Sequence, residues 1–185
     1  MKTKFSEETI AYDGSQLSSH WIFGHFDLQG DAVVAFTGPC DVKPEFMVDL
    51  VDKKEKKSIR SEAMLHFIVE LFDTDLTRTI LLQRLLVSLA QQELCRQTDG
   101  AVLHRTGNDL FEGEKKLSVS IATATPVSTL IHYGINVSSR NTPVPTKGLD
   151  DYGINPSAFA KTVLEGFRGE WDSLRIARSK AKGVG

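Results

Sequence analysis

The apolar segments of this sequence follow one another in an order that only a few folds can accommodate. Residues 31–37 (DAVVAFT) form a β-branched run between Gly30 and Gly38, which is typical of a buried strand. The segment 63–72 (AMLHFIVELF) is rich in β-branched and aromatic residues and is also predicted to be a strand. Three more strands are predicted over residues 46–51, 117–122 and 130–137. The charged segment 52–57 is predicted to be an exposed hairpin tip after the first of these strands, and a turn at Pro126 is predicted between the other two.

Two helices are marked by the residues that precede them. Asp75 is an N-cap candidate for a helix that runs to about Arg96 and carries a broad face of leucine and isoleucine. Asn155 is a second N-cap, and Pro156 takes the first helical position, where proline is favoured. Beyond residue 175 the chain is basic, and we expect a flexible tail over residues 176–185, with a basic docking segment as the alternative.

Strands, helix, strands and helix in this order, without the alternation of βαβ units, predict an α+β fold with a mostly antiparallel sheet and packed helices. The sequence contains no internal repeat, low-complexity stretch or Pro/Ser linker, so residues 1–175 are expected to form a single domain. Proteins often cover the edge strand of such a sheet by dimerising, so a homodimer is one expectation.

The composition limits the partners and the location that we expect. Lys and Arg number 22 against 24 Asp and Glu, a net charge of −2 that lacks the electrostatic footprint of a dedicated nucleic-acid binder. No apolar run approaches the roughly 20 residues that span a bilayer, and residues 1–10 lack the apolar core of a signal peptide. Two cysteines are too few for a disulfide scaffold. We therefore expect a cytoplasmic, globular protein with no nucleic-acid and no membrane partner.

The segment from Asn108 to Lys116 gathers several chemically useful side chains in one place. The simpler interpretation is a β-hairpin that turns at residues 112–113 and exposes Lys115 and Lys116 to solvent. In the functional interpretation, Asp109 supplies a carboxylate for Mg²⁺, which needs only one or two from the protein when phosphates supply other ligands. Lys116 would then point inward and stabilise negative charge on a phosphate or acyl oxygen.

The same segment carries a family resemblance. Residues 108–122 (NDLFEGEKKLSVSIA) resemble the region of biotin and lipoate protein ligases that contains their Asn-Asp-hydrophobic motif and active-site lysine, at the same Asn-to-Lys spacing. Residues 131–137 (IHYGINV) are similar to the Gly-Ile-Asn-Val strand of biotin ligases and to the corresponding strand of octanoyl transferases. Residues 59–68 (IRSEAMLHFI) lie where lipoate ligases have an Arg, a Ser-Gly-rich loop and a His. As a whole, the chain is most similar to an uncharacterised prokaryotic family, number 366 among the domains of unknown function.

The resemblance implies a biotin/lipoate ligase-like core of the class II synthetase type. For a ligase it implies ATP and Mg²⁺ as cofactors, whereas a transferase would need no ATP, and a cysteine or the acceptor lysine would attack a thioester carbonyl. It implies that Lys116 neutralises the substrate carboxylate and the α-phosphate, that Asp109 holds Mg²⁺, and that Asn108 donates to phosphate or carboxylate. The ligand would be a small carboxylate or acyl group such as lipoate, octanoate or biotin, and the partner an acceptor protein that offers a lysine. The other ligand-binding residues in these matching segments are Arg60, His66, Ser118, His132 and Asn136.

Two positions depart from the ligase pattern. Residues 58–64 (SIRSEAM) contain no glycine where ligases have a glycine-rich loop, although glycine is what lets backbone N–H groups approach a phosphate closely. Val119 stands where the ligase Lys-x-x-Gly pattern has glycine, so its side chain would narrow the space for the acyl chain or lipoyl ring.

Further side chains are candidates for the site because of their own chemistry. Cys40 follows the 31–37 strand in a Gly-Pro-Cys-Asp turn and is either an inert buried thiol or the nucleophile of a Cys/His pair. His66 either faces a cavity or is a hydrogen-bonded core residue. Arg105 precedes Asn108 by a short step and is a candidate clamp for phosphate or carboxylate. Cys95, on the first predicted helix, is expected to pack against the body of the protein.

Three functions therefore remain open. The first is an acyl-group ligase or transferase related to the biotin and lipoate enzymes. The second is a module on the same scaffold that binds a carboxylated or nucleotide ligand without turnover, which the missing glycine loop favours. The third is a structural or partner-binding protein in which the hairpin has no chemical role. The first two require Lys116, Asn108 and Asp109 to converge on one cavity with His66 or Arg105.

Overall fold

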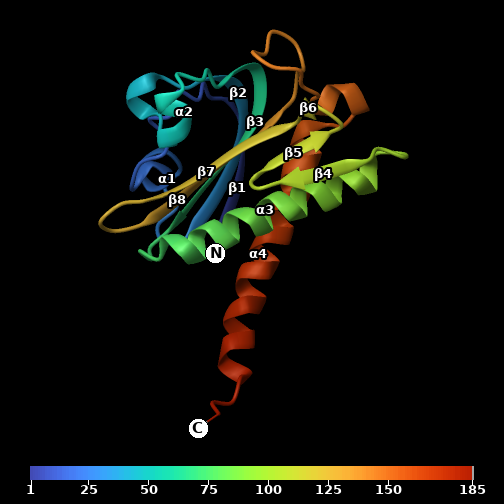
Figure 1. The fold of residues 1–185 in the computed structure, drawn as a ribbon. Helices are drawn as coiled ribbons and strands as arrows, with labels where there is room; N and C mark the ends of the chain where they lie inside the picture. Colours follow the sequence, from blue (N-terminus) through green and yellow to red (C-terminus); the bar gives the residue numbers. More distant parts are fainter. Residues whose placement is uncertain (185) are drawn as a thin grey trace.

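The computed structural model describes residues 1–184 and is built around a five-stranded sheet (Figure 1). The strand order is β1-β2-β3-β8-β7; β1 runs parallel to β2, and the other neighbours are antiparallel. A smaller sheet, β4-β5-β6, contacts β7 through β5. The strands are β1 (Lys2–Thr9), β2 (Ala32–Asp41), β3 (Arg60–Leu71), β4 (Leu103–Thr106), β5 (Asp109–Glu112), β6 (Lys115–Lys116), β7 (Ser118–Ala124) and β8 (Thr129–Asn136). The helices are α1 (Trp21–Phe26), α2 (Leu50–Lys54), α3 (Leu76–Gln97) and α4 (Pro156–Lys180), with 3-10 turns at Pro44–Phe46 and Leu149–Tyr152.

The predicted fold class is confirmed, and so are the two predicted helix starts. The Asp75 carboxylate accepts the backbone N–H of Arg78 at 3.0 Å, and the Asn155 side chain accepts that of Ala158 at 3.0 Å. Each cap satisfies one of the N–H groups that a helix start leaves without an internal partner. Within residues 1–184, neither of the two long helices nor any shorter one is apolar enough to cross a membrane.

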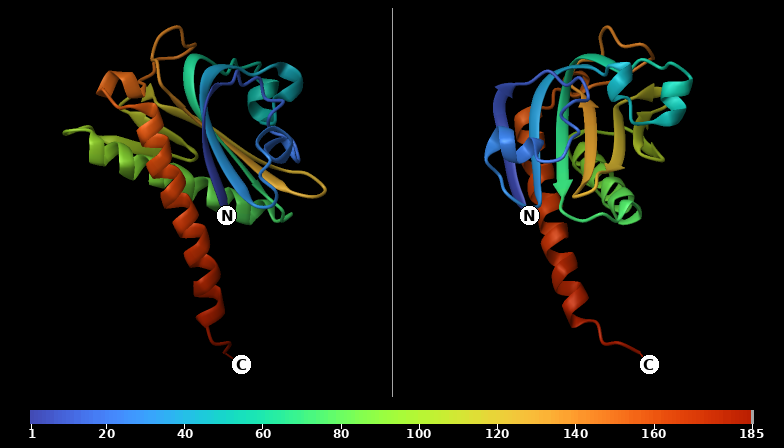
Figure 2. Two further views of the ribbon diagram at one scale, coloured as in Figure 1. Left: turned by 180° about the vertical axis from the view of Figure 1, so that it is seen from behind. Right: turned by 90° about the vertical axis from the view of Figure 1, so that its left-hand side faces the viewer.

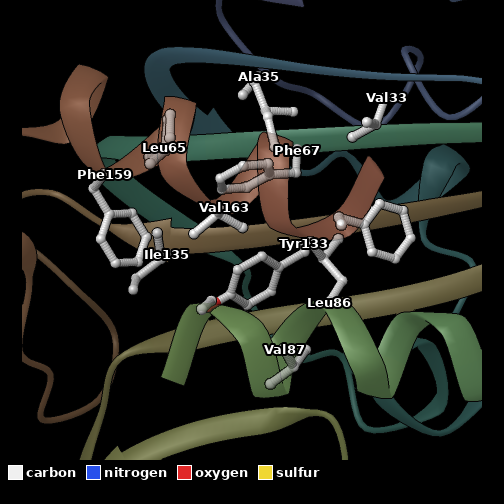
Figure 3. Close-up of a cluster of buried hydrophobic side chains, with 14 of the residues drawn as sticks. Val33, Ala35, Leu65, Phe67, Leu86, Val87, Tyr133, Ile135, Phe159 and Val163 are labelled. Atoms are coloured by element: carbon white, nitrogen blue, oxygen red, sulfur yellow. The ribbon is translucent and has the colours of Figure 1, made fainter. Parts of the chain in front are cut away.

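The two long helices cover one face of the central sheet and cross each other there (Figures 1 and 2). Side chains alternate between the two faces of a strand, so Ala35, Phe67 and Tyr133 point toward the helices and pack in the larger core cluster (Figure 3). Phe36 and Ile68, their immediate neighbours in sequence, point to the opposite face and pack in a second cluster with α1. Because both faces of β2 are covered, Ala32 to Phe36 are all buried, which explains the continuous apolar run in residues 31–37.

The strand predicted over residues 46–51 is wrong. The chain forms a 3-10 turn at Pro44–Phe46 and then helix α2, whose N-cap Asp49 accepts the backbone N–H groups of Val51 and Asp52 at 2.8 and 3.1 Å. A short apolar run does not distinguish strand from helix, and here the capping carboxylate decides. The charged segment 52–57 is consequently the end of a helix and not a hairpin tip.

The C-terminal helix is longer than predicted. Helix α4 continues past residue 175 to Lys180 and projects away from the sheet (Figure 2), although every side chain after Trp171 is exposed. Residues 174–180 (LRIARSK) are mostly strong helix formers, so the backbone stays helical without packing. The tail expected over residues 176–185 therefore begins no earlier than residue 181, and Gly185 lies outside the described residues. Basic docking by this end, and homodimerisation through an edge strand of the sheet, stay predictions.

Candidate active site

A cavity of about 740 Å³ lies on the sheet face opposite α3 and α4. Its floor is formed by side chains that project from adjacent strands, including Met64 of β3, Val119 of β7 and His132 of β8. The walls are formed by the β5–β6 hairpin, by the segment around α2, and by residues 142–146, which follow β8. The cavity therefore collects residues from several separate parts of the chain between Tyr12 and Thr146.

The expected hairpin is present, and it places Lys116 on the cavity wall and not in bulk solvent. Antiparallel pairing of Phe111 with Lys116 brings β6 against β5, and the Lys116 Nζ lies 2.5 Å from Oδ2 of Asp109. The two side chains are 29% and 25% exposed, whereas Lys115 next to them is fully on the outside. Burial raises the pKa of the Asp109 carboxyl, while the Lys116 ammonium acts in the opposite direction.

Two polar residues near this ion pair hold its backbone in place. The Ser118 hydroxyl accepts the N–H of Leu110 at 3.0 Å, which ties the hairpin to β7. The Asn136 amide donates to the carbonyls of Lys116 and Lys147, each at 3.3 Å. Both residues line the cavity, as does Asn108, whose Oδ1 is buried without a protein partner among the described residues. An unsatisfied buried oxygen costs about 1–3 kcal/mol, which a donor from a bound molecule would relieve.

Two buried histidines contact each other, one at the cavity floor and one behind it. His66 Nδ1 lies 3.1 Å from His132 Nε2, and His66 Nε2 lies 3.3 Å from the carbonyl oxygen of Gly38. The Tyr12 ring stacks on His132 with ring centres 3.9 Å apart. Burial lowers the pKa of His66 to about 3 and that of His132 well below its usual value, so both rings are neutral. Of the two, His132 lines the cavity and His66 lies behind it, which makes His66 the hydrogen-bonded core residue of the two alternatives.

The remaining candidates are placed differently from one another. Arg60 is exposed at the cavity rim. Arg105 is exposed outside the cavity wall, where its guanidinium donates to the carbonyl of Gly107, so it is not positioned as a clamp. Cys40 is only 1% exposed, and burial raises the pKa of its thiol to about 12. Of the two alternatives for this residue, these properties match the inert buried thiol. Cys95 was expected to pack but is exposed on α3.

Some lining residues carry no signal in the sequence. Tyr12 comes from the loop after β1 and reaches the floor because Tyr12 and Cys40 form a β-bridge. Residues 142–146 (TPVPT) lie along β6, where the N–H of Lys116 donates to the carbonyl of Pro145 at 2.9 Å. Two prolines in five residues indicate an extended segment, but its position against β6 is a matter of tertiary structure.

Two proteins of unknown function are similar to this chain in sequence, and the second is similar in fold as well. An uncharacterized protein of Methanocaldococcus jannaschii is 41% identical over 160 residues, which are 83% of this chain and 72% of the relative. A protein of unknown function from Pyrococcus horikoshi is 36% identical and has a TM-score of 0.93, over 100% of this chain and 99% of that one.

At lower identity the likeness extends to ligases and shows a shared fold. Biotin protein ligase from Aquifex aeolicus in complex with biotin and ATP has a TM-score of 0.61 at 15% identity, over 97% of this chain and 73% of the ligase. Lipoate-protein ligase A bound with ATP has a TM-score of 0.53 at 17% identity, over 90% of this chain and 84% of the ligase. The fold is therefore that of the biotin and lipoate protein ligases. The family model of the domain of unknown function DUF366 matches residues 1–182, and the chain belongs to this family.

Proposed function

We propose that this protein transfers a small acyl group to an amine, and that the cavity binds the acyl carbonyl beside Lys116. The observation that carries the proposal is the Lys116–Asp109 pair, which is three-quarters shielded from water on the cavity wall. An ammonium group in such a place stabilises developing negative charge more strongly than one in bulk water. The fold shared with a biotin ligase and a lipoate ligase supports a small carboxylate or acyl group as the ligand.

The reaction is one substitution at the acyl carbon. The amine of an acceptor, such as a lysine of another protein, attacks the carbonyl carbon of an activated acyl donor such as a thioester. As the C–N bond forms, the carbonyl oxygen becomes an oxyanion that the Lys116 ammonium stabilises. The C–S bond then breaks, and the proton lost by the amine neutralises the leaving thiolate, so the products are an amide and a thiol. Direct attack by the amine is favoured because Cys40 is buried and its thiol is not ionised.

The segment that would cradle the phosphates of ATP does not fit that role. Residues 60–64 form the start of β3 and pair with β2, Arg60 with Asp41 and Ser61 with Cys40. Successive N–H groups of an extended strand point to opposite sides, so they cannot converge on one phosphate as those of a glycine-rich loop do. For this reason the proposal contains no step through ATP.

A magnesium site has equally little support from the side chains. Within residues 1–184 no group of three or more His, Cys, Asp or Glu side chains is arranged to hold a metal ion, so Mg²⁺ would depend on one or two carboxylates and on oxygens of the ligand. Asp109, the carboxylate that the family resemblance assigns to Mg²⁺, is already paired with Lys116.

A module that binds a carboxylate without turnover is the second candidate. It is favoured by the ion pair itself, because Asp109 neutralises part of the charge that Lys116 would offer to an oxyanion. Binding and turnover therefore need separate measurements.

The first experiment titrates octanoate into the wild type, Lys116→Ala and Lys115→Ala by calorimetry. A charge-assisted hydrogen bond contributes about 1.5–3 kcal/mol, so Lys116→Ala should weaken binding roughly 10- to 100-fold. Lys115 is the adjacent lysine but is exposed, and its alanine variant should bind as the wild type does. Equal affinities of all three proteins would contradict a carboxyl site at Lys116.

The second experiment separates the two candidates. An octanoyl thioester and a lysine-containing peptide are incubated with each protein, and thiol release and peptide mass are followed. A transferase gives both products, with a rate about 10²–10³-fold lower for Lys116→Ala. Binding without thiol release indicates the non-catalytic module. Pyrophosphate release from free octanoate, ATP and Mg²⁺ would overturn the ATP-free route.

A further inference from the structure

The hydrogen bonds of the histidine pair assign a proton position to each ring. The Gly38 carbonyl oxygen only accepts, so the proton of neutral His66 is on Nε2, which faces it at 3.3 Å. His66 Nδ1 is then unprotonated and must accept from His132, whose Nε2 lies 3.1 Å away and therefore carries the proton. A neutral imidazole has one N–H, so His132 Nδ1 is left as a hydrogen-bond acceptor.

This acceptor belongs to a fixed side chain that forms part of the cavity wall. His132 is 3% exposed, lines the cavity, and its Nδ1 has no protein partner among the described residues. Stacking on Tyr12, with an angle of 12° between the rings, and the bond to His66 hold the plane of the imidazole. An acceptor on a cavity-lining ring that is held in one orientation and has no protein partner favours a ligand with a donor at that point.

The acceptor lies at a useful distance from Lys116. Strand β5 packs against β7, where the Leu110 N–H donates to the Ser118 hydroxyl at 3.0 Å, so the ion pair lies beside the outer edge of β7. His132 is on the next strand, β8, paired with Ile121 of β7. The strands that carry the ion pair and His132 lie on either side of β7, so roughly two strand spacings of 4.8 Å, on the order of 10 Å, separate their backbones. An extended chain of about eight carbons covers that distance.

We propose that the acyl group carries a hydroxyl or N–H donor near its far end, and that His132 Nδ1 accepts a hydrogen bond from it. This inference rests on the proposed function, since it assumes that the carboxyl end binds at Lys116. The substrate class is then a medium-length carboxylate with a terminal hydroxyl or amide group, and a plain fatty acyl chain is disfavoured. His66 acts as a positioning residue that selects the tautomer of His132.

Two acids that differ by one hydroxyl group test the proposal. Octanoate and 8-hydroxyoctanoate are titrated into the wild type, His132→Phe and His104→Phe by calorimetry. The wild type should bind 8-hydroxyoctanoate about tenfold more tightly than octanoate, a typical effect of one hydrogen bond. His132→Phe keeps an aromatic ring on Tyr12 but lacks the acceptor, so the two acids should bind this variant equally. His104 is exposed on β4, and its variant should keep the preference.

A second measurement uses the wild type alone and does not depend on how the variants fold. Long-range ¹H–¹⁵N correlation spectra of histidine side chains show which ring nitrogen carries the proton. We expect Nε2–H for both His66 and His132, and a shift of His132 Nδ1 on addition of 8-hydroxyoctanoate but not of octanoate. A proton on His132 Nδ1 would overturn the inference, as would equal binding of the two acids, and either result leaves the proposed function intact. If neither acid binds, the proposed function fails and this inference fails with it.

Discussion

Acid should destabilise this protein through the buried histidine pair. His66 is fully buried, and burial lowers its pKa from 6.5 to about 3. As the pH falls, the His66 imidazole of the unfolded chain is therefore protonated near pH 6.5, whereas that of the native state is protonated only near pH 3. The contribution of neutral His66 to the unfolding free energy is fully present above pH 6.5. It is lost as the pH falls from 6.5 to 3, because the unfolded state binds more protons than the native state in this range.

The size of the effect follows from the two pKa values. Integrating the difference in bound protons from pH 7 to pH 4 gives about 3 kcal/mol for His66 alone. His132 has the same sign, since burial lowers its pKa as well. Asp109 has the opposite sign, because burial raises its carboxyl pKa and the native state is then the first to take up that proton.

Urea unfolding at pH 7 and pH 4 measures the effect, with His66→Gln as the test and His104→Gln as the control. His66→Gln lacks the buried imidazole, so between the two pH values it should lose about 3 kcal/mol less stability than the wild type. His104 is exposed on β4, and its variant should follow the wild type. Comparison of variants cancels the contribution of Asp109. An equal loss in the wild type and His66→Gln would refute the assignment of a neutral, buried His66.

Three further predictions follow from the packing. A Cβ at Gly38 would overlap the backbone of Ile10, so Gly38→Ala should lower the unfolding free energy measured in urea by about 3 kcal/mol. Gly169 lies on the exposed surface of α4, so Gly169→Ala should raise the unfolding free energy by about 0.5–1 kcal/mol. A thiol reagent at pH 8 should modify Cys95 rapidly and Cys40 only after unfolding, because the Cys40 thiol is buried with a pKa of about 12; two fast thiols in the native protein would contradict this. Val119 narrows the cavity floor, so Val119→Gly should bind lipoate several-fold more tightly with octanoate affinity unchanged, and an unchanged lipoate affinity in calorimetry would show that Val119 does not limit the site.

Features that depend on short stretches of sequence could be predicted from the sequence. Asp75 and Asn155 are caps because a side chain and the N–H three residues later are close in any helix start. Lys116 and Asp109 lie on the two strands of one short hairpin, so the turn between them is enough to bring them together. The candidate ion pair was accessible to sequence analysis for that reason.

Where local signals conflict, the sequence alone was misleading. Residues 46–51 contain enough apolar side chains for a strand, but Leu50 and Val51 are exposed and Asp49 starts a helix instead. The end of α4 was expected to fray because it is basic, yet helix propensity keeps it regular to Lys180.

Only the tertiary structure decided which residues meet at the cavity floor. His66 and His132 are 66 residues apart, and they touch because the β3–β8 register sets His66 opposite Gly134 and leaves both imidazoles on the same sheet face. A shift of one residue in that register would turn one ring to the other face. The sequence by itself determined the core strands around residues 31–37, 63–72, 117–122 and 130–137, the helix caps and the Lys116 hairpin, because these depend on neighbours along the chain. The histidine pair, the stacked Tyr12 and the buried state of Cys40 depend on how distant strands align, and burial is what sets their ionisation.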